Sequence, residues 1–186
     1  LFNFDAHIMR IIGGKFKGHP LPVLKNFQGR PTTDFAKEGL MNTLHHLVQW
    51  EESQVLDLFS GTGALAMECL SRGALMCTMV ENVAGHVQQI KKNLLQFQFK
   101  NAQVVKADVL VWVKSCNAQY DLILADPPYD LPELSGLPEL LIPLLKEDGI
   151  LVLEHGKDHQ FEEHPNCFKE KRFGHVHFSF FSKLAQ

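Results

Sequence analysis

The chain has 186 residues, of which 45% are hydrophobic and 21% are charged, and its formal net charge at pH 7 is −3. This length suits a single domain with a full core, and the composition excludes a disordered or disulfide-stapled chain. The sequence lacks the roughly 18 consecutive apolar residues of a membrane span and the basic-then-apolar pattern of a signal peptide. Four scattered cysteines without a CxxC pair indicate reduced thiols, so we expect a cytoplasmic protein that is not bound to membranes.

The charge is unevenly distributed along the chain. Residues 1–37 carry six Lys or Arg against two acids, whereas residues 38–186 carry twelve against nineteen. A basic segment on an acidic body favours a polyanionic partner, although a solvated N-terminal segment would give the same asymmetry. We expect residues 1–8 to be a disordered leader or an upstream remnant, residues 9–33 to form a basic arm, and residues 34–186 to form the main domain.

The N-terminal part predicts an extended arm followed by a helix. Residues 10–18 place β-favouring residues around a Gly-Gly pair and, with residues 21–23, predict a small hairpin. Residues 30–34 read as a loop that ends in helix N-cap residues. The apolar spacing that follows predicts a helix from residue 34 to about residue 50, carried by Ala36, Leu40, Leu44, Leu47 and Val48.

From residue 54 onward, strand and helix patterns alternate. We predict strands at residues 55–59, 75–80, 102–106, 120–125 and 150–154, and helices at residues 64–72, 84–97, 109–114 and 137–145. Residues 168–173 and 175–182 predict a hairpin in which Val176, Phe178 and Phe180 alternate with polar neighbours. This order predicts an α/β, Rossmann-like fold: a mostly parallel seven-stranded sheet with an antiparallel C-terminal edge hairpin, helices on both faces and a small N-terminal β arm.

A glycine turn after the first of these strands predicts a nucleotide-type cofactor. Gly61-x-Gly63 lies between a strand and a helix, where glycines allow a tight bend and close approach of the backbone to a ligand. Glu81 ends the next strand, where a carboxylate can accept hydrogen bonds from ribose hydroxyls. Asp108 ends the third strand and could accept one from an adenine amino group. These features fit either a nicotinamide dinucleotide or S-adenosylmethionine.

Asp57 favours S-adenosylmethionine. It lies inside the first strand, four residues before Gly61, and a buried carboxylate is costly unless a cation or hydrogen-bond donors satisfy it. The ammonium of a methionine moiety would do so, whereas a pyrophosphate would be repelled. The alternatives are that Asp57 caps the glycine turn, and that Glu81 and Asp108 cap the helices that follow them.

The stretch Asp126-Pro127-Pro128-Tyr129 predicts the site of a second ligand. It follows the apolar run 120–125, at the carboxyl end of a parallel strand, where open α/β sheets bind ligands. The prolines stiffen the loop and leave few backbone donors to satisfy its carbonyls. A rigid set of acceptors beside an aromatic ring suits a flat group that carries an amine. The alternative is a proline-rich loop that merely ends a strand.

These motifs together resemble a class I S-adenosylmethionine-dependent methyltransferase that acts on exocyclic amines. Residues 10–18, 30–34, 38–42 and 57–74 narrow the resemblance to the RsmD family, whose members methylate guanine N2 in bacterial 16S ribosomal RNA. The resemblance runs from Met9 to nearly the C-terminus. It implies a class I methyltransferase fold, with residues 34–186 as the methyltransferase domain.

The resemblance also implies roles for individual residues. Asp57 would meet the methionine amino group, and the other cofactor-binding residues would be Gly61, Thr62, Gly63, Glu81, Asn82, Ala107 and Asp108. The catalytic loop would be Asp126, Pro127, Pro128 and Tyr129: Asp126 and the Pro127 carbonyl would accept the hydrogens of the target amine, and Tyr129 would stack on the base. The RNA-facing residues would be Arg10, Lys15, Lys17 and Arg30. The sequence departs from the family at Phe35, where a basic residue is usual, and has Lys37 where an arginine is common.

The resemblance therefore implies transfer of a methyl group from S-adenosylmethionine to guanine N2 in ribosomal RNA, with S-adenosylhomocysteine as the product. We expect ribosomal RNA or an assembling small subunit as partner, a monomer, and no metal, because the spacing of His155 and His159 falls at a strand end rather than on a helix. The alternatives are an adenine-N6 methyltransferase of DNA or RNA, a non-catalytic RNA-binding protein on the same scaffold and, more distantly, a nicotinamide dehydrogenase.

Overall fold

The computed structural model describes residues 9–24 and 34–183. The expected leader at residues 1–8 and the loop that carries Arg30 lie outside these ranges. Within them, no helix combines the length and the apolar character that crossing a membrane would require.

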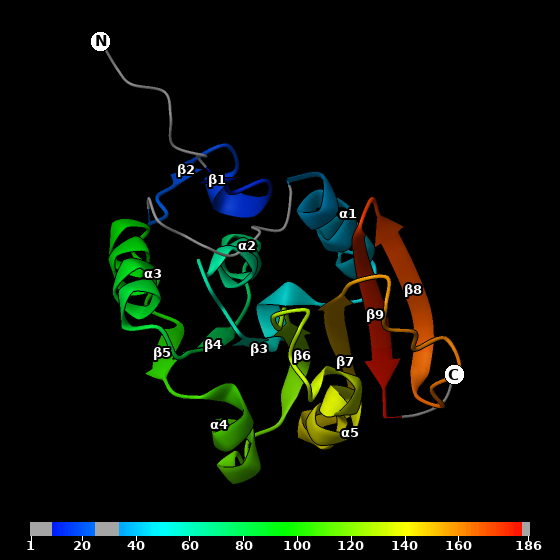
Figure 1. Ribbon diagram of the computed structural model, residues 1–186. Coiled ribbons are helices and arrows are strands. Elements are labelled where there is room, and N and C mark those ends of the chain that lie inside the picture. Colours follow the sequence, from blue (N-terminus) through cyan, green and yellow to red (C-terminus); the bar gives the residue numbers. More distant parts are fainter. Residues whose placement is uncertain (1–8, 25–33, 184–186) are drawn as a thin grey trace.

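A seven-stranded sheet in the order β5-β4-β3-β6-β7-β9-β8 forms the centre of the molecule (Figure 1). Its parallel strands are β3 (Gln54–Leu58), β4 (Met76–Glu81), β5 (Ala102–Lys106), β6 (Tyr120–Ala125) and β7 (Leu145–His155). The antiparallel strands are β8 (Cys167–Phe173) and β9 (Val176–Ser182), with β9 between β7 and β8. The predicted fold class is confirmed.

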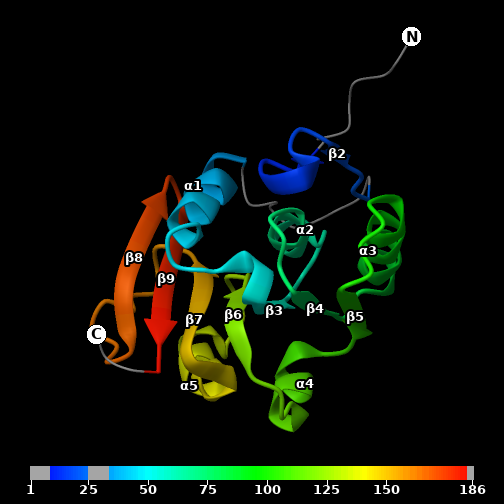
Figure 2. The same cartoon turned by 180° about the vertical axis from the view of Figure 1, so that it is seen from behind.

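Helices cover both faces of the sheet, as Figures 1 and 2 show. Helices α1 (Asp34–Leu44), α2 (Ala64–Ser71) and α3 (Ala84–Gln96) pack on one face, and α4 (Val109–Ser115) and α5 (Leu137–Leu141) pack on the other. Successive side chains of a strand point to opposite faces, so Val55 enters the core under α1–α3 whereas Leu56 enters the core over α4 and α5. Because both faces are covered, residues 122–125 of β6 are continuously apolar and buried.

The N-terminal arm is docked on α2. Strands β1 (Met9–Arg10) and β2 (Pro20–Leu21) pair antiparallel, and the short 3₁₀ helix η1 (Gly14–Phe16) lies between them. Gly14 has φ +70°, and a Cβ at this position would overlap the carbonyl oxygen of Ser71, so only glycine permits this close approach. The Phe16 ring packs edge-on against Phe97 and Phe99, with ring centroids 5.1 and 5.2 Å away.

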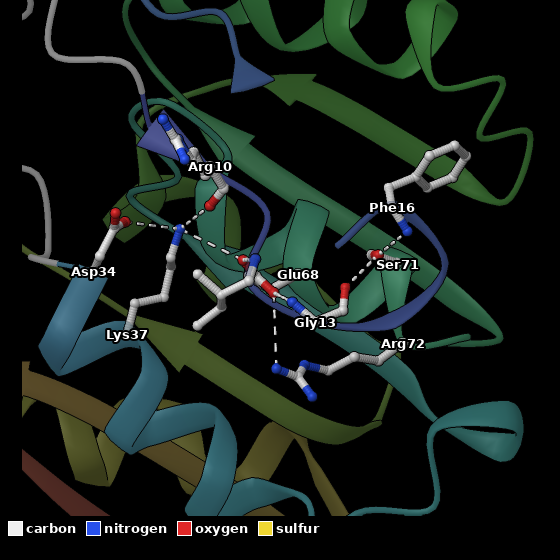
Figure 3. A network of polar contacts seen from close by, with 9 residues as sticks. Arg10, Gly13, Phe16, Asp34, Lys37, Glu68, Ser71 and Arg72 are labelled. Carbon is white, nitrogen blue, oxygen red and sulfur yellow. Dashed lines mark hydrogen bonds and ion pairs between the residues drawn. The ribbon is translucent and has the colours of Figure 1, made fainter. Parts of the chain in front are cut away.

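A buried polar network ties this arm to α1 and α2 (Figure 3). Glu68 Oε1 accepts a hydrogen bond from the Ile12 N–H at 2.6 Å, and its Oε2 accepts one from the Gly13 N–H at 3.2 Å. Lys37 Nζ lies 3.4 Å from Glu68 Oε1 and donates to the Arg10 carbonyl at 2.5 Å. Burial raises the pKa of Glu68, while the Ile12 N–H and the charges of Lys37 and Arg72 oppose that rise. The arm is therefore anchored through its backbone by two charged side chains that are themselves fully buried.

The structure corrects two predicted helix boundaries. Helix α1 ends at Leu44, and residues 45–48 form turns before the 3₁₀ helix η2 (Trp50–Glu52). Turns and helices both repeat every three to four residues, so the apolar spacing did not separate them. Helix α5 ends at Leu141 and continues as the 3₁₀ helix η4 (Ile142–Leu144), because Pro143 has no N–H for an α-helical hydrogen bond. A further 3₁₀ helix, η3 (Leu134–Gly136), precedes α5.

Two strand predictions also change. Strand β7 begins at Leu145 rather than Ile150, with a register shift opposite Tyr120 and Leu122 that accommodates the extra residues. In β9, Phe181 is as buried as Phe180, so the alternation noted for Val176, Phe178 and Phe180 does not continue to the end of the strand. The reason is that β9 is an interior strand of the sheet, with β7 on one side and β8 on the other, and both of its faces are covered there.

Candidate active site

A cavity of about 860 Å³ lies at the carboxyl ends of the parallel strands, a size that suits a cofactor together with part of a substrate. Its walls include ten residues that the sequence predicts to bind the cofactor or the target: Asp57, Gly61, Thr62, Glu81, Asn82, Asp108, Asp126, Pro127, Pro128 and Tyr129. Gly63 and Ala107, predicted with them, do not line it. Gly63 is the N-cap of α2, and the Ala107 N–H donates to the Glu81 carbonyl at 3.1 Å.

Asp57 is the cavity residue whose pKa is shifted furthest from its ordinary value. Its side chain is 2% exposed, and its Oδ2 has no hydrogen-bond partner among the described residues. Burial raises the pKa of Asp57 from 3.8 to about 7; the nearby Glu81 adds to the rise, while Ser60 and the Ala66 backbone oppose it. A buried acceptor without a donor is expensive, so the pocket is suited to a ligand that brings a positive charge or N–H groups to Asp57.

Glu81 and Gly61 shape the turn beside it. Gly61 has φ +51°, a left-handed conformation that favours glycine. The Gly61 N–H donates to Glu81 Oε2 and the Val83 N–H donates to Glu81 Oε1, both at 2.8 Å. Asp108 Oδ1 accepts from the Val111 N–H at 3.0 Å and so caps α4. Asp108 therefore caps the helix that follows it, as one alternative expected, whereas Glu81 holds the glycine turn and makes no capping hydrogen bond to α3. Both carboxylates line the cavity.

The loop after β6 forms the opposite side of the cavity. The Asp126 N–H bonds weakly to the Leu58 carbonyl at 3.4 Å, and the Leu131 N–H donates to the Pro128 carbonyl at 2.9 Å, which closes a turn around Tyr129. The Tyr129 hydroxyl donates to Glu154 Oε1 at 2.9 Å. Its ring lies over Gly156, where an added Cβ would be 3.1 Å from the ring. The ring is thus held by its hydroxyl and lies against Gly156, and Tyr129, 37% exposed, lines the cavity.

Several lining residues were missed by the sequence analysis. Glu154 is the second-last residue of β7, and the signal that could have found it is the one used for Asp126, an acid near the carboxyl end of a parallel strand. Phe59 has φ +58°, a strained conformation for a bulky residue, and lines the wall next to the glycine turn. His86 Nδ1 lies 3.4 Å from Glu81 Oε1. Met9 and Lys37 bring the arm and α1 to the cavity, which no motif indicated.

Three of the four predicted RNA-facing residues are described, and none of these three lines the cavity. Arg10, Lys15 and Lys17 are exposed, and Arg10 directly follows Met9, which lines the cavity. Lys15 Nζ lies 5.2 Å from the centroid of the Phe16 ring. Arg30 is outside the described residues.

The departure from the family pattern at the start of α1 has a structural counterpart. Phe35 is 69% exposed and packs edge-on against Phe173 of β8, with ring centroids 5.7 Å apart. Lys37 is fully buried on the other side of the helix, where it pairs with Glu68 and Asp34. At the described start of α1, therefore, an aromatic ring rather than a cation faces the solvent.

Within the described ranges, no group of three or more His, Cys, Asp or Glu side chains is arranged to hold a metal ion. The two histidines considered for such a role have other neighbours. His155 is buried, with its Nε2 2.8 Å from Ser179 Oγ, and His159 Nδ1 lies 3.3 Å from Ser135 Oγ.

The sheet order, the antiparallel C-terminal pair and the acid-lined cavity at the carboxyl ends of β3, β4 and β6 define a class I methyltransferase fold. The family model described as Conserved hypothetical protein 95 matches residues 9–182. The chain therefore belongs to this family, the RsmD family.

Named relatives and solved structures agree with this assignment. The chain is 32% identical over 182 residues to Ribosomal RNA small subunit methyltransferase D of Buchnera aphidicola subsp. Baizongia pistaciae, covering 95% of this chain and 92% of the relative. It is 37% identical over 146 residues to the Escherichia coli K12 protein of the same name, covering 78% and 71%. The solved structure of Escherichia coli yhhF superposes with a TM-score of 0.82 at 31% identity, covering 96% and 99%. The Thermus thermophilus 16S rRNA N2 G1207 methyltransferase RsmC, solved with AdoMet and guanosine, shares the fold at a TM-score of 0.75 and 23% identity, covering 95% of this chain and 50% of that one.

Proposed function

We propose that this protein transfers a methyl group from S-adenosylmethionine to the exocyclic N2 amine of a guanine in bacterial 16S ribosomal RNA. The single observation that carries the proposal is that one cavity brings together Asp57, Gly61 and Glu81 on one side and the Asp126–Tyr129 loop on the other. Relatives named Ribosomal RNA small subunit methyltransferase D support the choice of ribosomal RNA.

The residues present fit the methyl donor. Asp57 Oδ2 is a buried acceptor without a donor in the described structure, and the ammonium of the methionine moiety would supply both charge and N–H groups. Gly61 and Thr62 would lie along the donor, Glu81 and Asn82 would hold its ribose, and Asp108 would accept from its adenine amine. When bound, S-adenosylmethionine supplies an electrophilic methyl group on a positively charged sulfur.

The loop after β6 would hold the target base. A guanine amine is a poor nucleophile because its lone pair is delocalised into the ring. Asp126 and the Pro127 carbonyl would accept its N–H bonds, orient the amine and favour a more pyramidal nitrogen. Tyr129 would stack on the base and so offset part of the cost of taking it out of its helix.

Positioning and local electrostatics would supply most of the rate. Asp126 need not be a strong base, because the amine nitrogen becomes acidic once it is alkylated. Its carboxylate would hold the amine in line with the methyl group and accept the released proton. The exposed cations of the arm would add a salt-dependent affinity for the RNA backbone.

The test is methyl transfer from labelled S-adenosylmethionine to unmodified small-subunit ribosomal RNA or small-subunit particles, followed by nucleoside analysis. We expect N2-methylguanosine, and recovery of N6-methyladenosine would instead support the adenine alternative. The variant Asp126→Ala should lose at least about 100-fold in kcat/KM while its affinity for the donor changes little, because in the proposed mechanism Asp126 accepts from the target amine rather than from the donor. The exposed Asp148→Ala is the matched control. Normal turnover by Asp126→Ala would refute the assigned role.

A further inference from the structure

Two stretches of the chain carry cations and no acids. Residues 9–24 and 82–107 together hold seven of the 18 Lys and Arg of the protein and none of its 21 Asp and Glu. Each of these cations is exposed: Arg10, Lys15, Lys17, Lys91, Lys92, Lys100 and Lys106. Positive charge is therefore concentrated in the arm and in the segment that contains α3, although the whole chain has a net charge of −3.

The structure joins these two stretches into one surface (Figures 1 and 2). The arm lies beside α3, where Asn93 Nδ2 donates to the Pro22 carbonyl at 3.0 Å. The arm also touches the far end of this helix, because the Phe16 ring packs edge-on against Phe97 and Phe99. Cations that are far apart in the sequence therefore lie on adjoining elements.

Lys92 lies on the flank of α3 that faces the arm. It follows Gly85 by seven residues and Gln89 by three, and residues at these spacings share one side of a helix. A Cβ at Gly85 would be 3.3 Å from Leu24 Cδ1 of the arm. Gln89 Nε2 donates at 2.9 Å to the Asn93 side chain, which in turn binds the arm. Both neighbours thus place Lys92 on the arm side of the helix.

Lys100 and Lys15 lie at one aromatic cluster. Lys100 directly follows Phe99, whose ring centroid is 5.2 Å from that of Phe16. Lys15 Nζ is 5.2 Å from the centroid of the same Phe16 ring. We call the exposed cations of this surface the basic face: Arg10, Lys15, Lys17, Lys92 and Lys100.

The charges of the basic face are not neutralised by acids of residues 9–24 and 34–183. None of its five cations makes an ion pair there with Asp or Glu. The residues three and four positions from Lys92, where an acid would stabilise a helix, are glutamines and a leucine. Glu68, which lies beneath the arm, is fully buried and pairs with Lys37. Like charges on neighbouring elements repel one another, so this surface suits a polyanion that neutralises them.

The basic face begins at the rim of the cavity. Met9, which directly precedes Arg10, lines the cavity, and so do Val83 and His86 at the start of α3. Helix α3 has 13 residues, so the surface extends about 20 Å away from this rim. A nucleic-acid strand that lies on the basic face therefore reaches the cavity at one end.

We propose that the basic face is an extended RNA-binding surface, in which Lys92 and Lys100 join the arm in binding phosphates of the strand that flanks the target guanine. The inference rests on the proposed function and deepens it, because it carries the RNA contacts from the arm onto α3 and the turn that follows it. Phosphate contacts fix the position of a nucleic acid without reading its sequence. The basic face would hold the substrate, and the loop after β6 would receive the base.

Single charge reversals test this surface at equal changes in net charge. Lys92→Glu and Lys100→Glu alter the basic face, and the control Lys114→Glu alters an exposed lysine of α4, on the opposite face of the sheet. Binding of unmodified small-subunit ribosomal RNA by the full-length protein is measured over a range of salt concentrations, without the methyl donor. Each reversal on the basic face should weaken binding at least about threefold and lower the slope of log K against log salt by about one. Lys114→Glu should change neither.

Two further measurements identify the contacts as phosphate contacts. An unrelated RNA of the same length should lose affinity by the same factor in Lys92→Glu and Lys100→Glu, because phosphates carry no sequence information. In methyl transfer these variants should raise the KM for RNA and leave kcat largely unchanged, since neither side chain lines the cavity. Urea unfolding checks that each variant is folded. Should a reversal fail to fold, Lys92→Gln and Lys100→Gln take its place and should still lower the slope.

The outcomes separate this inference from the proposed function. Unchanged affinity and slope in both Lys92→Glu and Lys100→Glu, or an equal loss in Lys114→Glu, would overturn the basic face as a binding surface and leave the proposed function intact. If both reversals weaken RNA binding as expected but wild type forms no N2-methylguanosine, the proposed function fails and the RNA-binding surface stands.

Discussion

Replacing Asp57 with asparagine should stabilise the ligand-free protein and abolish binding of the methyl donor. Burial raises the pKa of Asp57 from 3.8 to about 7 in the folded state. A carboxyl group whose pKa is raised by folding costs no stability at a pH below its unfolded pKa. The loss in the free energy of unfolding grows as the pH rises above the unfolded pKa, and it is complete above the folded pKa. A shift of about 3 units corresponds to roughly 4 kcal/mol. Asparagine has nearly the same shape and no charge, so this penalty disappears.

The gain in the free energy of unfolding should therefore depend on pH: up to about 4 kcal/mol at pH 8 and only about 2 kcal/mol at pH 5. Urea unfolding of ligand-free wild type, Asp57→Asn and the exposed control Asp148→Asn at both pH values measures it. Repeating the series with S-adenosylmethionine should stabilise wild type and Asp148→Asn by mass action but leave Asp57→Asn unchanged. An equal gain at both pH values, or a less stable Asp57→Asn at pH 8, would refute the reasoning.

Two further predictions concern the arm. Lys37→Met should destabilise the protein by about 3–5 kcal/mol at pH 8, because it leaves the Glu68 carboxylate buried without its closest cation. The loss should be smaller at pH 5, because burial raises the pKa of Glu68 and the carboxylate is more readily protonated there. Urea unfolding against the exposed control Lys92→Met tests this, and a loss that does not vary with pH would contradict it. Charge reversal at Lys15 and Lys17 should weaken binding of small-subunit RNA and flatten its dependence on salt, with about one unit of slope lost per phosphate contact; an unchanged slope in a filter-binding titration would remove the arm from the RNA interface.

Much of the fold could be predicted from short stretches of the sequence. The apolar strands around Leu56 and Ile123, the glycine turn at Gly61 and the hairpin at Gly174 each depend on a few neighbouring residues, and all are found in the structure. The errors arose where local spacing is ambiguous. Leu47 continues the apolar spacing of the predicted helix, but in the structure it lies in the turns that follow α1. Phe181 is buried only because β9 lies inside the sheet.

The cavity residues that could be predicted from the sequence are those at or near the carboxyl ends of the parallel strands. Parallel strands bring their carboxyl ends to one edge, so the acids at Asp57, Glu81, Asp108 and Asp126 were expected to meet without knowledge of the sheet order. Glu154 belongs to the same pattern, but it stands in no motif and becomes a neighbour of Asp126 only through the β6–β7 register.

The network of Lys37 and Glu68 could not be inferred, because two charged residues are buried there by an arm that approaches α2 from 55 residues away or more in sequence. No local pattern signals such a contact. The sequence analysis noted Lys37 only as standing where an arginine is common, and the structure buries it between α1 and α2.

The sheet order has a consequence for how such proteins diversify. The strands that carry Glu81 and precede Asp108 lie on one side of β3, and those that carry Asp126 and Glu154 lie on the other. In the proposed arrangement, the residues for the methyl donor and those for the target base therefore occupy separate halves of one sheet, which meet at β3. Under the proposed roles, substitutions on the β6–β7 side would change which base is recognised, while the β4–β5 side would keep its fit to the donor.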